Sequence, residues 1–272
     1  MRAIDFEYDG QYLSSYGFII CDFNFSNGAT EATAGAAITF NKVSRHQGKA
    51  YSLSSTQYNE CITTTFDICK NPDVFDLEDR EISPDEHTNI MRWLNRREFF
   101  RMCFIGDDEY DQKVVYYNAS FNITKIKIGE KLYGLRIAME TDRPFGYGQE
   151  QKTILDFSQS TAPKIINDVS DDIGSIYPTV IIECRSSGDL SIRNTLEGCY
   201  TVIKNCSDGE VITLYGDTHI IKSSLNSHDI CDDFNYDFFR IGNTINNRSN
   251  VVMVSLPCIL TVKYSPIIKD TP

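Results

Sequence analysis

Apolar and polar residues alternate along much of this sequence, which is the pattern of β-strands with one buried face. Ile4, Phe6 and Tyr8, for example, alternate with acidic residues. The pattern predicts strands over residues 4–8, 16–25, 62–68, 99–105, 114–128, 132–139, 179–184, 190–194, 198–204, 210–215, 219–223, 238–241, 251–255 and 259–264. The strands 114–128 and 132–139 are expected to form a long hairpin with its tip at Gly129.

Residues 26–50 break this pattern, because they are rich in Gly, Ala, Thr and Asn. Long loops inside a compact domain are uncommon and are usually functional or disordered. We therefore expect a mobile loop or arm here, with one short strand at residues 38–40. Its basic residues, Lys42, Arg45 and Lys49, belong either to a solvated loop or to an arm that meets an acidic neighbour in an assembly.

One helix is predicted, over residues 84–96. Ser83 and Glu86 have the spacing of a capping box, in which each side chain satisfies a free backbone N–H at the helix start. Apolar residues then follow at the spacing of a single helix face, which is expected to pack across a sheet. These residues are Ile90, Trp93 and Leu94.

Residues 140–164 combine Pro and Gly in the manner of turns and linkers. Beyond them, short strands recur with no helical period between them, which is typical of an antiparallel sandwich. The sequence therefore predicts a mainly β fold with two domains. Residues 1–145 would form an N-terminal β domain with one helix and a long hairpin, and residues 146–272 would form a C-terminal β-sandwich.

The composition is that of a globular protein, with 41% hydrophobic and 24% charged residues. The net charge of −12 argues against binding to a nucleic acid backbone or an anionic membrane, because both require a positive surface. The N-terminus has no apolar signal core, and no apolar run approaches the roughly 18 residues of a membrane span. We therefore expect folding in a cytoplasm, with the nine cysteines as thiols.

Two acidic segments could bind a cation, but each has a simpler interpretation. Residues 107–111 lack the spacing and glycine of a calcium loop, so a charged hairpin turn is favoured. His228 and Cys231 precede Asp232 and Asp233, but a second ligand pair at metal spacing is missing, which favours an acidic loop. No recognised nucleophile, zinc or phosphate-binding motif occurs. Two distant carboxylates could still converge as in a glycosidase, although the sequence nominates no pair.

The order of several motifs resembles one protein family. The N-terminal part contains Phe6-x-Tyr8-x-Gly10, Tyr16-Gly17-Phe18-Ile19, the strand Thr63–Ile68, Arg92-Trp93-Leu94, Tyr116-Tyr117-Asn118-Ala119 and Arg143-Pro144-Phe145. The C-terminal part contains Phe239–Asn243 followed by Asn250–Val254. In this order, the motifs resemble the distal tail protein (Dit) family of long-tailed bacteriophages, especially those of Gram-positive hosts.

The resemblance implies that residues 1–145 are a β-sandwich, called the belt domain, which forms a ring of six copies. It also implies a galectin-like or carbohydrate-module-like β-sandwich outside the ring, formed by residues 146–272. It implies a structural protein without catalysis or cofactors, located at the virion tail tip as the baseplate hub after assembly in the host cytoplasm. The implied partners are other copies of the chain, the major tail tube protein, the tail-associated lysin or tail fibre protein, and a receptor-binding protein. The genome would pass through an acidic lumen without specific binding.

A ring in which each copy contacts the next uses heterologous contacts, for which long hairpins and strand edges are suited. The loop 26–50 and the hairpin 114–139 are therefore the expected contact segments. Their basic residues are the candidate ring or partner contacts, namely Lys42, Arg45, Lys49, Lys125, Lys127 and Lys131.

The alternative function is a carbohydrate-binding module that contacts host cell-wall polysaccharide. Sugar sites in such folds use aromatic faces together with polar side chains. The C-terminal half contains no Trp, which leaves four tyrosines as candidate platforms, namely Tyr177, Tyr200, Tyr215 and Tyr236. A hydrolase that clears the cell wall is a third hypothesis, but no recognised catalytic motif in the sequence supports it.

Overall fold

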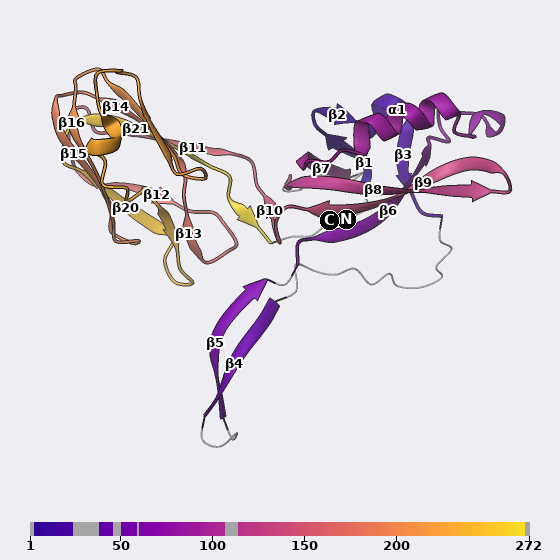
Figure 1. Ribbon diagram of the computed structural model, residues 1–272, viewed down its shortest axis with the longest axis horizontal. Helices are drawn as coiled ribbons and strands as arrows, with labels where there is room; N and C mark the ends of the chain where they lie inside the picture. The colour runs from indigo at the N-terminus through magenta and orange to yellow at the C-terminus, as the bar shows by residue number, and fades with distance from the viewer. Residues whose placement is uncertain (1–2, 24–37, 46–49, 59, 107–113, 270–272) are drawn as a thin grey trace. The chain divides into compact units, whose positions relative to one another are not determined.

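The protein is described by a computed structural model that covers residues 3–23, 38–45, 50–58, 60–106 and 114–269 (Figure 1). The chain divides into two compact units, the first formed by Met1–Gly148 with Ile268–Pro272 and the second by Gln149–Ile267. The fold is mainly β with one main helix in the described residues, which confirms the predicted fold class.

Nine strands of the first unit form one sheet, in the order β2-β1-β7-β8-β9-β6-β3, with β10 paired to β8 and β22 paired to β10. Their bounds are β1 Ala3–Tyr8, β2 Gln11–Tyr12, β3 Phe18–Cys21, β6 Thr63–Lys70, β7 Phe100–Gly106, β8 Tyr116–Ile128, β9 Lys131–Thr141, β10 Gly146–Tyr147 and β22 Ile267–Ile268. Two short 3-10 helices lie at Leu13–Tyr16 and Leu77–Asp79. The long hairpin is present as β8 and β9, with Ile128 paired to Lys131 across its tip.

Helix α1 spans Pro84–Leu94 and ends two residues before the predicted end. Its start is the predicted capping box. The Glu86 N–H donates to Ser83 Oγ at 3.3 Å, and the Ser83 N–H donates to Glu86 Oε2 at 2.8 Å. Each bond satisfies a backbone donor that has no partner within the helix.

Trp93 lies on the apolar face of α1 and belongs to the hydrophobic core of the first unit. Figure 1 shows α1 lying over the sheet beside β1. The Trp93 ring stacks on Phe6 at 5.6 Å and on Tyr16 at 4.7 Å between ring centroids. Its indole N–H donates to the Tyr8 carbonyl oxygen at 3.1 Å. A large aromatic side chain with its single polar group satisfied thus fixes the helix on the first strands.

Residues 38–58 differ from the prediction. Strands β4, Ile38–Arg45, and β5, Ala50–Tyr58, form a separate two-stranded sheet, visible as a ribbon in Figure 1. The interpretation of this stretch as a loop with one short strand at 38–40 was therefore wrong. The rest of the segment predicted as a mobile arm, residues 26–37 and 46–49, lies outside the described residues.

The second unit is a sandwich of two sheets. The five-stranded sheet has the order β11-β21-β14-β17-β18, the four-stranded sheet has the order β12-β20-β15-β16, and β13 pairs with β19. The bounds are β11 Gln151–Asp156, β12 Lys164–Asn167, β13 Gly174–Ile176, β14 Thr179–Cys184, β15 Gly188–Asn194, β16 Cys199–Cys206, β17 Val211–Tyr215, β18 Ile220–Ser223, α2 Ile230–Asp233, β19 Ile241–Asn243, β20 Ser249–Val254 and β21 Cys258–Tyr264.

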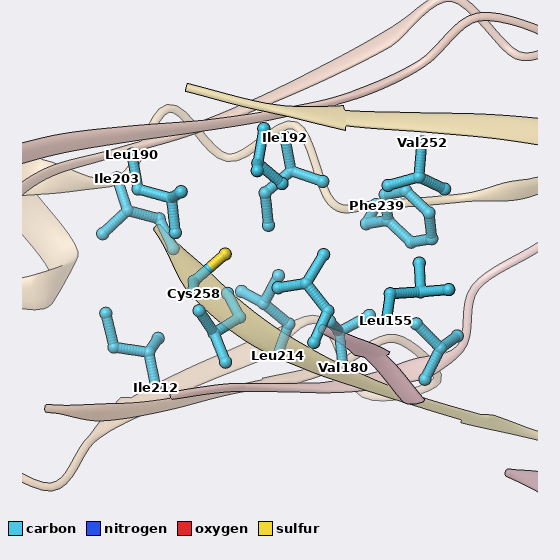
Figure 2. Close-up of a cluster of buried hydrophobic side chains, with 14 of the residues drawn as sticks. Leu155, Val180, Leu190, Ile192, Ile203, Ile212, Leu214, Phe239, Val252 and Cys258 are labelled. Carbon is cyan, nitrogen blue, oxygen red and sulfur yellow. The ribbon is translucent and has the colours of Figure 1, made fainter. Parts of the chain in front are cut away.

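Side chains of the two sheets meet in one hydrophobic core (Figure 2). Ile192 and Val252 extend from the four-stranded sheet toward Val180 and Leu214 of the five-stranded sheet. Two local predictions differ from the structure. The predicted linker includes β11, and the strand predicted at residues 238–241 begins only at Ile241.

Candidate interaction surfaces

The β4–β5 hairpin has one apolar face. Asn41 pairs with Ser55, whereas Lys42 pairs with Leu53, so Ser54 is an extra residue that shifts the register. Residues paired across two antiparallel strands point to the same side. The shift therefore gathers on one face Ile38, Phe40, Tyr51 and Leu53. Between 43% and 66% of each of these four side chains is exposed.

Two predicted contact residues lie on this hairpin. Lys42 belongs to its apolar face and Arg45 to the opposite face, and both are exposed. Within the described residues, neither has an acidic side chain at salt-bridge distance. Lys49 lies outside the described residues.

The tip of the β8–β9 hairpin holds the other three candidate lysines, all of them exposed. Lys131 already has a partner in its own unit, because its Nζ lies 2.7 Å from Glu81 Oε2. This contact raises the pKa of Lys131. Lys125 and Lys127 form no salt bridge in the part of the chain that the structure describes, and they remain available to another molecule.

The loop that connects β6 to α1 was not identified by the sequence analysis. We call residues 71–80 the acidic loop, since they contain four acidic residues and one basic residue. Arg80 holds its backbone, donating from Nε to the Phe75 carbonyl and from Nη2 to the Pro72 carbonyl, each at 3.3 Å. Val74 and Leu77 nevertheless expose 66% and 78% of their surface. The alternation of acidic and apolar residues in this loop was the available signal.

In the second unit, the residues on either side of Tyr236 bind strand β16. Asn235 donates from Nδ2 to the Tyr200 carbonyl at 2.7 Å, and the Tyr200 N–H donates to Asp237 Oδ2 at 2.8 Å. Tyr236 itself has a φ of +59° and exposes 64% of its surface. A left-handed conformation is unfavourable for tyrosine, so the neighbouring bonds must hold it.

A line of ring contacts joins Tyr236 to Tyr177. Centroid distances are 5.3 Å from Tyr236 to Phe234, 5.0 Å from Phe234 to Phe238, 5.0 Å from Phe238 to His219 and 4.8 Å from His219 to Tyr177. The two phenylalanines in the middle are buried, and the two tyrosines at the ends are exposed. The structure therefore connects two of the four predicted platforms.

The other two predicted platforms have different surroundings. Tyr200 is exposed on β16, where Asn235 and Asp237 bind its backbone. Tyr215, on β17, lies 5.6 Å from the Lys222 ammonium group. The neighbouring Gly216 is packed so tightly that a Cβ there would lie 2.4 Å from the Tyr177 carbonyl carbon.

His228 forms a buried ion pair with Glu210 rather than part of an open acidic loop. His228 Nδ1 lies 2.6 Å from Glu210 Oε1, and His228 Nε2 lies 3.2 Å from Asp233 Oδ2 without a directed hydrogen bond. Glu210 is fully buried and also accepts bonds from the Ser223 hydroxyl and the Ser207 N–H.

The pKa values of this pair move apart. Burial opposes the charge on Glu210, but the bonds from Ser223, His228 and Ser207 outweigh it and lower the pKa of Glu210. Burial likewise opposes the charge on His228, but the bond to Glu210 outweighs it and raises the pKa of His228. Both groups therefore carry their charges between pH 4.5 and pH 6.5, the ordinary pKa values from which the two are shifted outward.

In the described residues, no group of three or more His, Cys, Asp or Glu side chains could hold a metal ion. The nine cysteines form no disulfide. No helix of the described chain is long and apolar enough to span a membrane. The acidic segment 107–111 lies outside the described residues.

Comparison with protein families gives two adjacent matches. Residues 1–143 match the model of a phage tail protein N-terminal domain, and residues 145–264 match that of a phage tail C-terminal domain. The chain belongs to this phage tail protein family. No curated protein matches this chain.

Its structure is similar to the crystal structure of the Dit protein of phage SPP1, described as a paradigm of the hub adsorption apparatus in phages that infect Gram-positive bacteria. The two chains share 13% sequence identity at a TM-score of 0.67, over 97% of this chain and 99% of SPP1 Dit. A chain of the activated phage p2 baseplate gives a TM-score of 0.47 at 10% identity, over 97% and 98% of the two chains. The likeness to SPP1 Dit confirms the Dit-like fold that the resemblance implies.

Proposed function

We propose that this phage tail protein is the hub at the distal end of its tail, forming a ring of six copies. The observation that carries the proposal is the likeness to SPP1 Dit, which spans both units of the chain. A fold shared over the full length preserves the arrangement of elements in both units, although at 13% identity the contact residues are this chain's own.

The ring would join the tail tube protein on one side to the tail-associated lysin or fibre protein and the receptor-binding protein on the other. The role is structural, without catalysis, and its place is the virion tail tip after assembly in the host cytoplasm. Two features of the first unit support contacts between copies. The β4–β5 hairpin exposes apolar residues, and the β8–β9 tip presents Lys125 and Lys127.

The test is the native mass of the purified protein, combined with negative-stain images of the same sample. Six chains of 31.0 kDa have a mass of about 186 kDa. Ring-shaped particles of that mass are the expected result. A protein that remains a monomer at every concentration would contradict a self-assembling ring.

The second candidate function is binding of cell-wall polysaccharide by the second unit. The line of rings from Tyr177 to Tyr236 favours it, because two exposed aromatic faces are held in fixed positions with Arg240 beside Tyr177. A glycan array tests it. Binding that is lost in Tyr236→Ala and retained in Lys152→Ala would support this function.

A further inference from the structure

Two surfaces of the first unit have opposite charge. The described strands of the β4–β5 hairpin, residues 38–45 and 50–58, contain two basic residues and no acidic residue, although the whole chain has a net charge of −12. The acidic loop contains four acidic residues and one basic residue. We propose that the apolar face of the β4–β5 hairpin binds the acidic loop of a second copy of this chain. The inference rests on the proposed assembly of copies and names the surfaces that meet.

The exposed apolar face of the β4–β5 hairpin is expected to bind another surface. An isolated two-stranded hairpin is at best marginally stable in water. Among the described residues, none from β4 or β5 belongs to the hydrophobic core of the first unit. The side chains of Phe40 and Leu53, which would be buried in a stable sheet, lie exposed on one face. Burial of that face against another molecule would supply the missing stabilisation.

The acidic loop is a suitable receiving surface because its backbone is held in place. The Phe75 ring packs beside the Lys70 ammonium group, 4.8 Å from the ring centroid. It also fills the space at Gly17, whose φ of +78° and lack of a Cβ allow this approach. A partner that binds Val74 and Leu77 would therefore lose little entropy in ordering the loop.

The charges of the two surfaces are unmatched within one chain. In the described residues, Asp73, Asp76 and Glu78 have no cation at salt-bridge distance, as Lys42 and Arg45 have no anion. Lys42 lies on the apolar face, so bringing that face onto the loop of a second copy would pair Lys42 with the loop carboxylates. Unlike charges across an interface set its register and speed its formation, while the apolar side chains supply most of the affinity.

This contact is heterologous, because the hairpin of one copy meets a different surface on the next. Each copy carries both surfaces, so the contacts continue from copy to copy and close into a ring when the rotation permits. An eight- or nine-residue strand is about 27–31 Å long, which is enough to reach across a neighbouring domain.

The test uses two charge-reversed variants of the full chain. The hairpin variant carries Lys42→Glu, and the loop variant carries Asp73→Lys, Asp76→Lys and Glu78→Lys. The matched control carries Lys152→Glu, which makes the same charge change at an exposed position of the second unit. Circular dichroism and Trp93 fluorescence show whether each variant is folded.

Sedimentation velocity at low salt then measures assembly. Each variant alone should associate at least about tenfold more weakly than the wild type, because the apolar face of its hairpin and its loop now carry the same sign of charge. An equimolar mixture of the two variants should assemble again, since each hairpin meets a loop of opposite charge on the other variant. The control should assemble like the wild type.

If the wild type forms rings and both charge-reversed variants still form them, this inference is overturned and the proposed function is unaffected. A mixture of the two folded variants that stays monomeric would also overturn it. So would a loop variant that assembles normally while the hairpin variant does not, because the hairpin would then bind a different surface. A wild-type chain that never associates would contradict the ring itself.

Discussion

Replacing His228 by Phe should destabilise the second unit. Phe fills the site with a planar ring only slightly larger than imidazole, but it offers Glu210 no hydrogen-bond donor and no positive charge. Removal of one partner from a buried ion pair typically costs about 3–5 kcal/mol. Glu210 would keep its bonds to the Ser223 hydroxyl and the Ser207 N–H, so we expect the lower end, about 3 kcal/mol. For a unit of this size, that is a fall in Tm of about 12 °C.

Thermal unfolding of the full chain, followed by circular dichroism, measures the loss. The only Trp of the chain, Trp93, lies in the first unit, so its fluorescence reports separately that this unit is unchanged. The matched control is His228→Phe combined with Glu210→Gln. With both charges removed, most of the stability should return, because no buried charge is left without a partner.

The loss should depend on pH. The folded pKa of His228 lies above its ordinary value of 6.5, so its charge stabilises fully below pH 6.5 and loses this effect as the pH rises through the folded pKa. The folded pKa of Glu210 lies below 4.5, so its charge stabilises above pH 4.5 and loses this effect as the pH falls through the folded pKa. The difference between wild type and variant should therefore be largest between pH 4.5 and 6.5. An equal difference at pH 6 and at pH 10, or a double variant as unstable as His228→Phe, would refute this reasoning.

Three further substitutions test the local structure. Ser83→Ala should lower the free energy of unfolding of the first unit by about 1 kcal/mol, whereas Ser83→Asp should retain most of it, as measured by urea denaturation with Trp93 fluorescence. Trp93→Phe should cost about 1–3 kcal/mol by circular dichroism, because the Tyr8 carbonyl loses its indole donor; no change would mean that this bond is unimportant. Tyr236→Gly should be about 1 kcal/mol more stable than Tyr236→Ala in thermal unfolding, because glycine accepts a φ of +59° without strain.

The parts of the fold that could be predicted are those in which the chain buries its own residues. Helix α1 followed from Ser83, Glu86 and the apolar face behind them, and the β8–β9 hairpin followed from alternation ending at Gly129. In both, the sequence contrast exists because one face meets a core and the other meets water.

The β4–β5 hairpin could not be predicted in the same way. Both of its faces are exposed within the chain, and an extra residue at Ser54 hides the alternation on β5. Lys42 and Arg45 were recognised as contact candidates from their charge alone. The pairing of His228 with Glu210 could not be predicted from the sequence either. The two residues are 18 positions apart, one in the β16–β17 connection and the other in the β18–α2 connection, and only the fold brings them together.

The chain leaves the nine-stranded sheet after β10 and returns to it at β22, which pairs with β10. The second unit is therefore an insertion, with both of its connections leaving from adjacent strands. Any other domain whose termini lie close together could occupy the same place without altering the order of the sheet. A phage under pressure to change hosts could therefore acquire a new surface by exchanging the second unit, while the nine-stranded sheet of the first unit stays the same.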